Sequence, residues 1–422
     1  MNHDNLDTLQ SLKVKVVHLQ DATGKVQALF PFDAMLDIAA ITRISKRRLS
    51  PSNTYNIESD VLLNTDKVIT YIDQSLQEQV NLTIKKSENS SFHQIEAKEI
   101  SKIFAGMHCQ FGHFAIDRDL LNKEVEHHGN DEQSLQKALG RFQSIRLKQR
   151  LEETLELPPL PASSQRIIRL CSDENAGTDE LCEVISLDPS LAAQVVSWAS
   201  SPYYGAPGEI ESVEDAIIRV LGFDMVMNLA LGLSMGKALT IPENGPRHYE
   251  SYWFQAVSFA SLMEALVKNM PANKRPRLGH AYLAGLLHNF GLLAIGAVLP
   301  PHFSILSRHL EVNAHLPTNL VEMFLLKLSR EQIGAWLLRH WALPDGICNG
   351  IRYSKNLAYE GEHAIIAKLL SVCHNLFNNE EVTPATQAII GLDQEQLDAI
   401  YQELKKNSDN IKLMASLINN GN

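Results

Sequence analysis

Hydrophobic residues change their spacing near residue 134, and this change divides the chain into two parts. In the first part, β-branched runs at residues 14–19 and 26–30 flank the turn-forming segment 21–24, a pattern that predicts a β-hairpin. Further candidates are a helix over residues 32–41 and strands or helix ends over residues 67–72 and 80–84. These patterns predict a mixed α/β domain at the N-terminus.

The second part begins with a helix that joins the two domains. Residues 134–156 follow a helical spacing, and Ser134 can act as the N-cap. Residues 157–161 read Leu-Pro-Pro-Leu-Pro and end this helix, because proline has no N–H and keeps the preceding residue out of the helical conformation. We therefore expect an α/β domain over residues 1–133, a linker helix over 134–156 and a helical domain over 157–422.

Signals for helix starts recur throughout the helical domain. Ser, Thr and Asp favour N-cap positions because their side chains accept hydrogen bonds from unpaired backbone N–H groups. The predicted starts are at Thr178, Asp188, Ser212, Ser329, Thr383 and Asp393. The helix after Ser212 should end at Gly222, and Gly285 suits a close helix crossing. No strand pattern follows Ser163, so the sequence predicts a multidomain protein with an α/β domain followed by an all-α bundle.

The net charge of −11 comes entirely from the C-terminal part. Residues 1–150 carry 19 basic and 19 acidic side chains, whereas residues 151–422 carry 19 and 30. An acidic domain repels phosphate backbones, which argues against nucleic acid as its partner. One basic cluster in the N-terminal part is interpreted as a solvated face rather than a nucleotide contact. Its members are Arg43, Lys46, Arg47 and Arg48.

Cysteine usage and hydropathy indicate a cytoplasmic protein. The five cysteines are scattered without a CxxC pair, which argues against both a disulfide framework and a thiolate zinc site. The longest apolar stretch, around residues 281–300, is interrupted by His288 and Asn289, and no basic segment precedes an apolar run at the N-terminus. The sequence therefore predicts neither a membrane span nor a signal peptide.

Several motifs of the helical domain resemble the HDOD family, the HD-related output domains. They are Leu-Pro-Pro-Leu-Pro at 157–161, Leu-Asp-Pro-Ser-Leu at 187–191, Ala-Ser-Ser-Pro-Tyr-Tyr-Gly at 199–205, Ala-Ile-Ile-Arg-Val-Leu-Gly at 216–222, Leu-Ala-Gly-Leu-Leu-His-Asn-Phe-Gly at 283–291, Ile-Gly-Ala-Trp-Leu-Leu at 333–338 and Trp-Ala-Leu-Pro at 341–344. The resemblance covers most of residues 157–360 and implies an HD-like helical bundle. From the residues alone, the motifs specify the fold, with Tyr203 and Tyr204 covering the core and their hydroxyls facing water.

The same resemblance raises the question of a metal site. HD enzymes use a histidine, an adjacent His-Asp pair and further His or Asp ligands, because divalent cations favour anionic and imidazole donors. Here the pair reads His288-Asn289, and Gln255 lies where the first histidine would be. Arg330 and Lys355 replace histidines found in relatives, and both would repel a cation. We therefore predict no metal, no cofactor and no catalytic residue.

His288 is the one imidazole that remains. A histidine on an apolar helix is more often a hydrogen-bonded core residue than a ligand. A retained polar pocket of Gln255, His288, Asn289 and Arg330 is nevertheless a candidate for binding a small anionic ligand. Three other histidines, at residues 302, 309 and 315, have no acidic partner in the pattern and are interpreted as surface or loop residues.

The N-terminal part resembles, in patches, the YbaK-type aminoacyl-tRNA deacylase fold. The residues that carry this resemblance are Gly24 to Pro31 with Asp33, Phe111-Gly112, Ile116 to Leu121 and Glu124-Val125. Lys46 is the nearest candidate for a catalytic lysine, but its neighbours do not match the enzyme pattern. We expect a degenerate sensory or docking domain.

The leading interpretation is a bacterial signalling protein that acts through protein-protein contacts of a non-catalytic HDOD domain. Its partners would be other signalling proteins, with no nucleic acid and no membrane. The alternative is a metal-dependent phosphohydrolase of the HD superfamily that acts on nucleotides or cyclic dinucleotides. A third hypothesis, tRNA proofreading by the N-terminal part, predicts release of amino acids from mischarged tRNA.

Overall fold

A computed structural model describes residues 11–52, 62, 68–78, 81–85, 92–99, 108–125, 134, 160–171, 173, 176–236, 238–239, 245–246, 252–298 and 300–419. The chain forms two compact units. Unit 1 contains Met1–Gly129, Asn244–His248 and Pro301–Lys327, and unit 2 contains Asn130–Glu243, Tyr249–Pro300 and Leu328–Asn422. The division does not follow chain order, because Pro301–Lys327 belongs to unit 1 although both flanking segments belong to unit 2.

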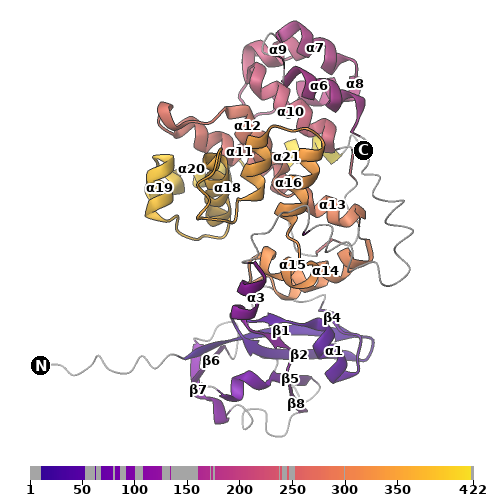
Figure 1. The fold of residues 1–422 in the computed structure, drawn as a ribbon, viewed down its shortest axis with the longest axis vertical. Helices are drawn as coiled ribbons and strands as arrows, with labels where there is room; N and C mark the ends of the chain where they lie inside the picture. Colours follow the sequence, from indigo (N-terminus) through magenta and orange to yellow (C-terminus); the bar gives the residue numbers. More distant parts are fainter. Residues whose placement is uncertain are drawn as a thin grey trace, which may run out of the picture. The chain divides into compact units, whose positions relative to one another are not determined.

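Unit 1 is built on a mixed β-sheet (Figure 1). Its strands are β1 (Leu12–Asp21), β2 (Gly24–Pro31), β4 (Ser50–Pro51), β5 (Ile69–Asp73), β6 (Asn81–Lys85), β7 (Phe92–Glu96) and β8 (Cys109–Gly112), in the order β7-β6-β1-β2-β5-β8, with β4 also paired to β1. A small second sheet joins β3 (Met35–Leu36) to β9 (Ala115–Ile116). The helical elements are α1 (Ile38–Ser45), η1 (Gln74–Glu78), η2 (Ala97–Glu99), α3 (Arg118–Val125), α14 (Pro300–Val312) and α15 (Thr318–Leu326).

The predicted hairpin is confirmed. β1 and β2 pair antiparallel, with Asp21 opposite Gly24 across the turn. Side chains alternate along a strand, so each face of the sheet buries its own hydrophobic cluster. Val17 and Leu19 join the cluster that includes Val312 of α14, whereas Val14 and Val16 join the other.

Two other predictions in unit 1 have different outcomes. Residues 69–73 and 81–85 are strands, in agreement with the candidate strands there. The helix predicted over residues 32–41 begins only at Ile38. The reason is local: Met35 and Leu36 pair with β9, and the Asp37 side chain caps the helix by accepting a hydrogen bond from the Ala39 N–H.

Polar side chains of residues 309–315 bind the backbone that leads into α1. The Asn313 amide accepts from the Leu36 N–H at 2.7 Å and donates to the Leu36 carbonyl at 3.1 Å. His309 Nε2 accepts from the Ile38 N–H at 3.4 Å, and His315 Nε2 donates to the Ala34 carbonyl at 3.1 Å. The expectation that these histidines are surface or loop residues is therefore wrong for His309, which is 4% exposed. His315 is partly buried and also holds backbone.

All the regular secondary structure among the described residues of unit 2 is helical. Its elements are α6 (Ala162–Cys171), α7 (Thr178–Ser186), α8 (Pro189–Ala199), α9 (Val213–Asp215), the π-helix η3 (Ala216–Leu221), α10 (Phe223–Gly236), α11 (Tyr252–Asn269), η4 (Ala272–Lys274), α12 (Leu278–Leu287), α13 (Phe290–Val298), α16 (Arg330–His340), α17 (Asp345–Arg352), α18 (Ala364–Phe377), α19 (Pro384–Ile390), α20 (Gln394–Lys406) and α21 (Ser408–Asn419). The predicted helical domain is thus confirmed in its class.

Most predicted helix starts are confirmed at the level of individual side chains. The N-caps that accept a backbone N–H are Asp188, Ser212, Ser329, Thr383 and Asp393. One prediction was shifted by a residue: Gly177, not Thr178, is the N-cap of α7, and its N–H donates to Glu180 at 2.9 Å. Gly222 ends its helix at a positive φ of 82°, as predicted.

The prediction that the hydroxyl of Tyr204 faces water is wrong. It donates to the Glu264 carboxylate at 3.2 Å, and Glu264 is only 4% exposed. Glu264 also pairs with Lys268 at 2.6 Å. A buried carboxylate needs such partners, since an unpaired charge in the interior is strongly destabilising. The tyrosine therefore supports the carboxylate inside the bundle.

Among the residues that the structure describes, one apolar segment, Leu278–Ala297, is long enough to cross a membrane. Of its most apolar 18-residue window, 83% is buried inside the fold. Core helices satisfy the same length and composition criteria, so the segment is weak evidence for a span. The predicted cytoplasmic location stays a prediction, and the linker helix predicted over 134–156 lies outside the described residues except for Ser134.

Glycines set the closest helix crossings of unit 2. An ideal Cβ on Gly291 of α13 would lie 1.9 Å from the carbonyl oxygen of Arg330, the first residue of α16. On Gly285 of α12 it would lie 2.8 Å from the Ala260 Cα of α11, which confirms the predicted close crossing there. Real Cβ atoms do not approach backbone this closely, so α13 and α16 can touch only through glycine.

We expect Gly291→Ala to destabilise the protein by about 1–3 kcal/mol or more, because the added methyl group forces two helix backbones apart. Denaturant unfolding of the full chain measures this loss. Gly346→Ala in α17 is the matched control, since its nearest neighbour is the side chain of His363 at 3.3 Å. Equal stability of the two variants would contradict the backbone crossing.

Candidate functional site

The four residues predicted to form a polar site come from three places in the helical bundle. Gln255 lies on α11, His288 ends α12, Asn289 directly precedes α13, and Arg330 begins α16. His288, Asn289 and Arg330 are 8%, 4% and 6% exposed. Capping places Arg330 here, because the Ser329 hydroxyl accepts from the Gln332 N–H and starts α16 at Arg330.

Hydrogen bonds link three of these side chains in a row. The Arg330 guanidinium donates from Nη1 to the Asn289 side-chain oxygen, Oδ1, at 2.7 Å. The Asn289 amide in turn donates to the Gln255 side-chain oxygen at 3.5 Å, a long contact. The amide of Asn289 is thus oriented with its oxygen toward a cation of the protein itself. Arginine can only donate, so it binds the oxygen of the amide, whereas a backbone carbonyl would bind the amide nitrogen.

His288 is held as a neutral ring. Its Nδ1 lies 2.7 Å from the Gly285 carbonyl, which can only accept, so Nδ1 carries the proton and Nε2 keeps a lone pair. The ring stacks on Phe259, with centroids 3.9 Å apart and planes tilted by 11°. Burial lowers the pKa of His288 to about 3; the Gly285 carbonyl opposes this shift, and the charges of Lys355 and Arg330 add to it.

His374 on α18 is a fifth member that the sequence reasoning missed. Its ring centroid lies 5.8 Å from that of His288, and both rings contact Phe259. Burial, together with the charge of Lys355, holds the pKa of His374 well below its usual range. The sequence did contain a pattern that could have pointed to His374: it interrupts the apolar sequence of α18, as His288 follows the apolar sequence of α12.

The donor set does not suit a divalent cation. Asn289 offers a neutral oxygen that already accepts from Arg330, and the five residues named above include no carboxylate. Among the residues that the structure describes, no three His, Cys, Asp or Glu side chains are grouped so that they could hold a metal ion. The residues at the HD-like position therefore do not fit the metal centre of the HD enzymes.

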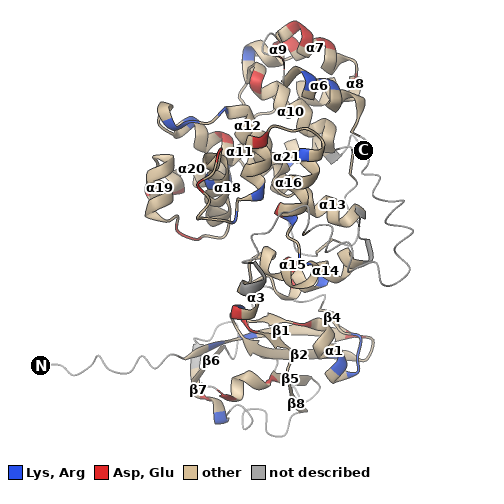
Figure 2. Ribbon diagram, in the orientation of Figure 1, with Lys and Arg blue, Asp and Glu red and all other residues tan. Residues whose placement is uncertain are grey.

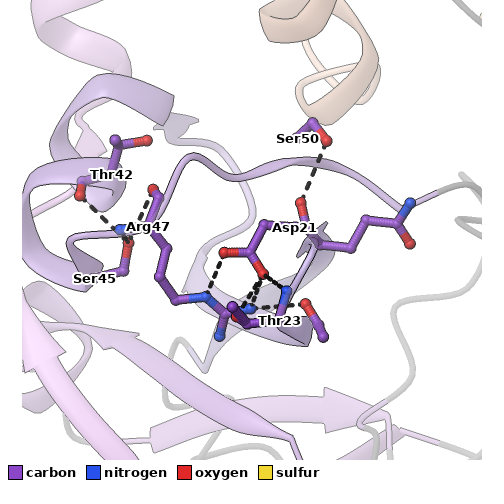
Figure 3. A network of polar contacts seen from close by, with 8 residues as sticks. Asp21, Thr23, Thr42, Ser45, Arg47 and Ser50 are labelled. Atoms are coloured by element: carbon purple, nitrogen blue, oxygen red, sulfur yellow. Dashed lines mark hydrogen bonds and ion pairs between the residues drawn. The ribbon is translucent and has the colours of Figure 1, made fainter.

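The basic cluster of the N-terminal part is partly used for folding (Figure 3). Arg47 donates to the Asp21 carboxylate at 2.8 and 2.5 Å and to the Gly24 carbonyl at 2.8 Å. This guanidinium holds the pKa of Asp21 well below its usual range. Lys46 is exposed and ends α1 in the left-handed conformation, at φ 54°. Arg47 thus ties the end of α1 to the hairpin turn.

The buried ring of His288 should make stability depend on pH. An unfolded histidine gains a proton below about pH 6.5, whereas the folded ring resists protonation down to about pH 3, so stability falls as the pH falls between these values. His288→Phe should reduce this fall by up to ~1.4 kcal/mol per pH unit. Urea unfolding between pH 7 and 5 tests it, with the exposed His340→Gln as control; identical slopes for both variants would refute the buried neutral ring.

Known proteins share this architecture. The HDOD domain family matches residues 157–357. A solved structure from Marinobacter aquaeolei VT8, of a protein provisionally assigned to signal transduction, is 37% identical to this chain, with a TM-score of 0.85. That match covers 98% of this chain and 94% of the Marinobacter chain, so it includes both units.

More distant similarities are also found. A protein of Shewanella amazonensis SB2B, provisionally described as a phosphohydrolase, is 21% identical with a TM-score of 0.49 over 64% of this chain and 97% of its own; a likeness at this level says nothing about chemistry here. An uncharacterized protein of Treponema pallidum (strain Nichols) is 23% identical over 207 residues, which are 49% of this chain but only 39% of that protein. The Marinobacter protein is similar along almost the whole of this chain, and the family match shows that residues 157–357 of the chain are an HDOD domain.

Proposed function

We propose that this protein is a bacterial signalling protein whose HDOD domain acts by binding other proteins rather than by catalysis. The observation that carries the proposal is the hydrogen bond from Arg330 to Asn289 at 2.7 Å. It puts a guanidinium beside the pair that corresponds to the His-Asp pair of the enzymes. A second cation there would be repelled, whereas hydrolysis of phosphate esters in HD enzymes needs that cation.

The surface of the helical unit supports protein contacts. Acidic side chains gather on α7 and α9 (Figure 2), where the first turns contain Asp179, Glu180, Glu214 and Asp215. Such a surface favours basic partners and disfavours nucleic acid. The provisional assignment of the Marinobacter relative to signal transduction points in the same direction. In this proposal the N-terminal unit acts as the input or docking domain, and its resemblance to the YbaK-type fold stays a prediction.

Metal content separates this function from phosphohydrolase activity. We expect the purified full chain to contain well below one iron, manganese or zinc ion per molecule and to release no phosphate from nucleotides or cyclic dinucleotides. Elemental analysis and a phosphate-release assay measure both quantities. Asn289→Asp is an informative companion, because Arg330 should bind the new carboxylate as an ion pair and still exclude metal. Stoichiometric metal in the natural sequence would overturn the proposal.

A second candidate function is the binding of a small anion near His288. The specific support is electrostatic. Burial is the main cause of the lowered pKa of His288 and of His374, and the charges of Lys355 and Arg330 lower it further. The Arg330 guanidinium itself lies 2.7 Å from the Asn289 side chain, so the cluster lies in a positive field. Phosphate groups are the natural ligands of such a field.

Calorimetric titration of the full chain with inorganic phosphate, nucleotides and cyclic dinucleotides tests anion binding. We expect a saturable signal that Lys355→Gln weakens by about tenfold, the usual effect of losing a charged hydrogen-bond donor. Lys412→Gln, which removes an exposed lysine paired with Asp409, should bind as the natural sequence does. If none of these ligands gives a saturable signal, the positive cluster has only a structural role.

A further inference from the structure

Two helices inside the HDOD sequence fold with the other unit. The family match covers residues 157–357, and Pro301–Lys327 lies within it, yet this segment belongs to unit 1. α15 packs against α3, and Val312 of α14 enters the hydrophobic cluster on one face of the β1–β2 hairpin. The HDOD sequence therefore supplies part of the N-terminal unit.

The segment is fixed by specific hydrogen bonds as well as by hydrophobic packing. Asn313 pairs with both backbone groups of Leu36, at 2.7 and 3.1 Å, and is 1% exposed. His309 and His315 hold Ile38 and Ala34 on either side of it. Loss of one partner leaves a buried backbone group unsatisfied, which is strongly unfavourable. Residues 34–38 and the helix pair α14–α15 should thus move together.

At both ends, Pro301–Lys327 is flanked along the chain by a helix that lies next to the Asn289–Arg330 hydrogen bond: α13 on the N-terminal side and α16 on the C-terminal side. Upstream, α13 begins at Phe290, immediately after Asn289, and ends at Val298, two positions before α14 begins. Downstream, α15 ends at Leu326 and α16 begins at Arg330. The connections from α13 to α14 and from α15 to α16 are only a few residues long, so they can take up only a small displacement of one helix relative to the next.

The two flanking helices, α13 and α16, pack backbone against backbone. Gly291 meets the Arg330 carbonyl where a Cβ would lie only 1.9 Å from it, and the Gly334 backbone packs on Gly291 as well, where a Cβ would lie 2.9 Å from the Gly291 nitrogen. Packed backbones of this kind shift between discrete arrangements rather than deform continuously. We therefore expect a displacement of either end of α14–α15 to reach the side chains of Asn289 and Arg330.

We propose that Pro301–Lys327 is a coupling element, through which the state of the N-terminal unit sets the geometry of the Asn289–Arg330 pair. The proposal rests on the proposed function, in which the N-terminal unit receives a signal and the HDOD domain responds. The coupling runs through the chain itself, from residues 34–38 to α14–α15 and on to α13 and α16. Because coupling is reciprocal, a substitution at Arg330 should also change the hydrogen exchange of residues 34–38.

Hydrogen exchange of the full chain tests the coupling. Asn313→Ala should accelerate exchange of peptides from α13 and α16 by about fivefold or more, the lower end of typical coupling energies, while α7 and α20 stay unchanged. His315→Phe is a milder second variant, because it keeps a ring beside Phe30 and Phe32 and loses the hydrogen bond to Ala34. Gln94→Ala is the control, since it removes only an exposed contact to Ser11 in the same unit.

The reciprocal measurement uses Arg330→Gln and follows peptides that contain residues 34–38 and 301–327. Faster exchange there supports the coupling element. If the Asn313 and His315 variants change exchange only within unit 1, and the Arg330 variant only within unit 2, the proposal is wrong. Neither result depends on metal content or phosphate release, so the coupling and the proposed function can fail separately.

Discussion

The contact of two helix backbones at Gly291 is the constraint on which the candidate site depends. Because α13 and α16 touch without side chains between them, the residue before one helix and the first residue of the other are held at hydrogen-bond distance. Asn289 and Arg330 are therefore neighbours through main-chain geometry. A larger residue at Gly291 would separate them even if both side chains were kept.

The cluster that results is a hydrogen-bonded core rather than an open set of ligands. A protonated Nδ1 binds the Gly285 carbonyl, the Asn289 oxygen binds a guanidinium, and the rings of His288 and Phe259 stack. Each of these contacts stabilises a neutral imidazole and an oriented amide. The positive charge beside the Asn289 amide belongs to the polypeptide itself, in Arg330.

Local features of the fold could be predicted from the sequence, because a helix cap or a hairpin turn depends on residues within one turn of each other. Asp188, Ser329 and Asp393 cap helices as the sequence predicts, and the β1–β2 hairpin has its predicted turn. Features that depend on distant residues could not be predicted. His374 meets His288 through tertiary packing, in a direct ring contact and against the shared ring of Phe259, and the backbone of Leu36 offers no sequence pattern that points to Asn313.

The helix pair of residues 301–327 has a consequence for how such proteins can be rearranged in evolution. A gene fusion that exchanged the N-terminal region at the linker would bring in a new sheet but keep the old α14 and α15. Those helices carry Val312, His309 and Asn313, which fit the face and backbone of the present unit 1. The two regions are therefore not interchangeable modules: any replacement has to match the helix pair or bring its own.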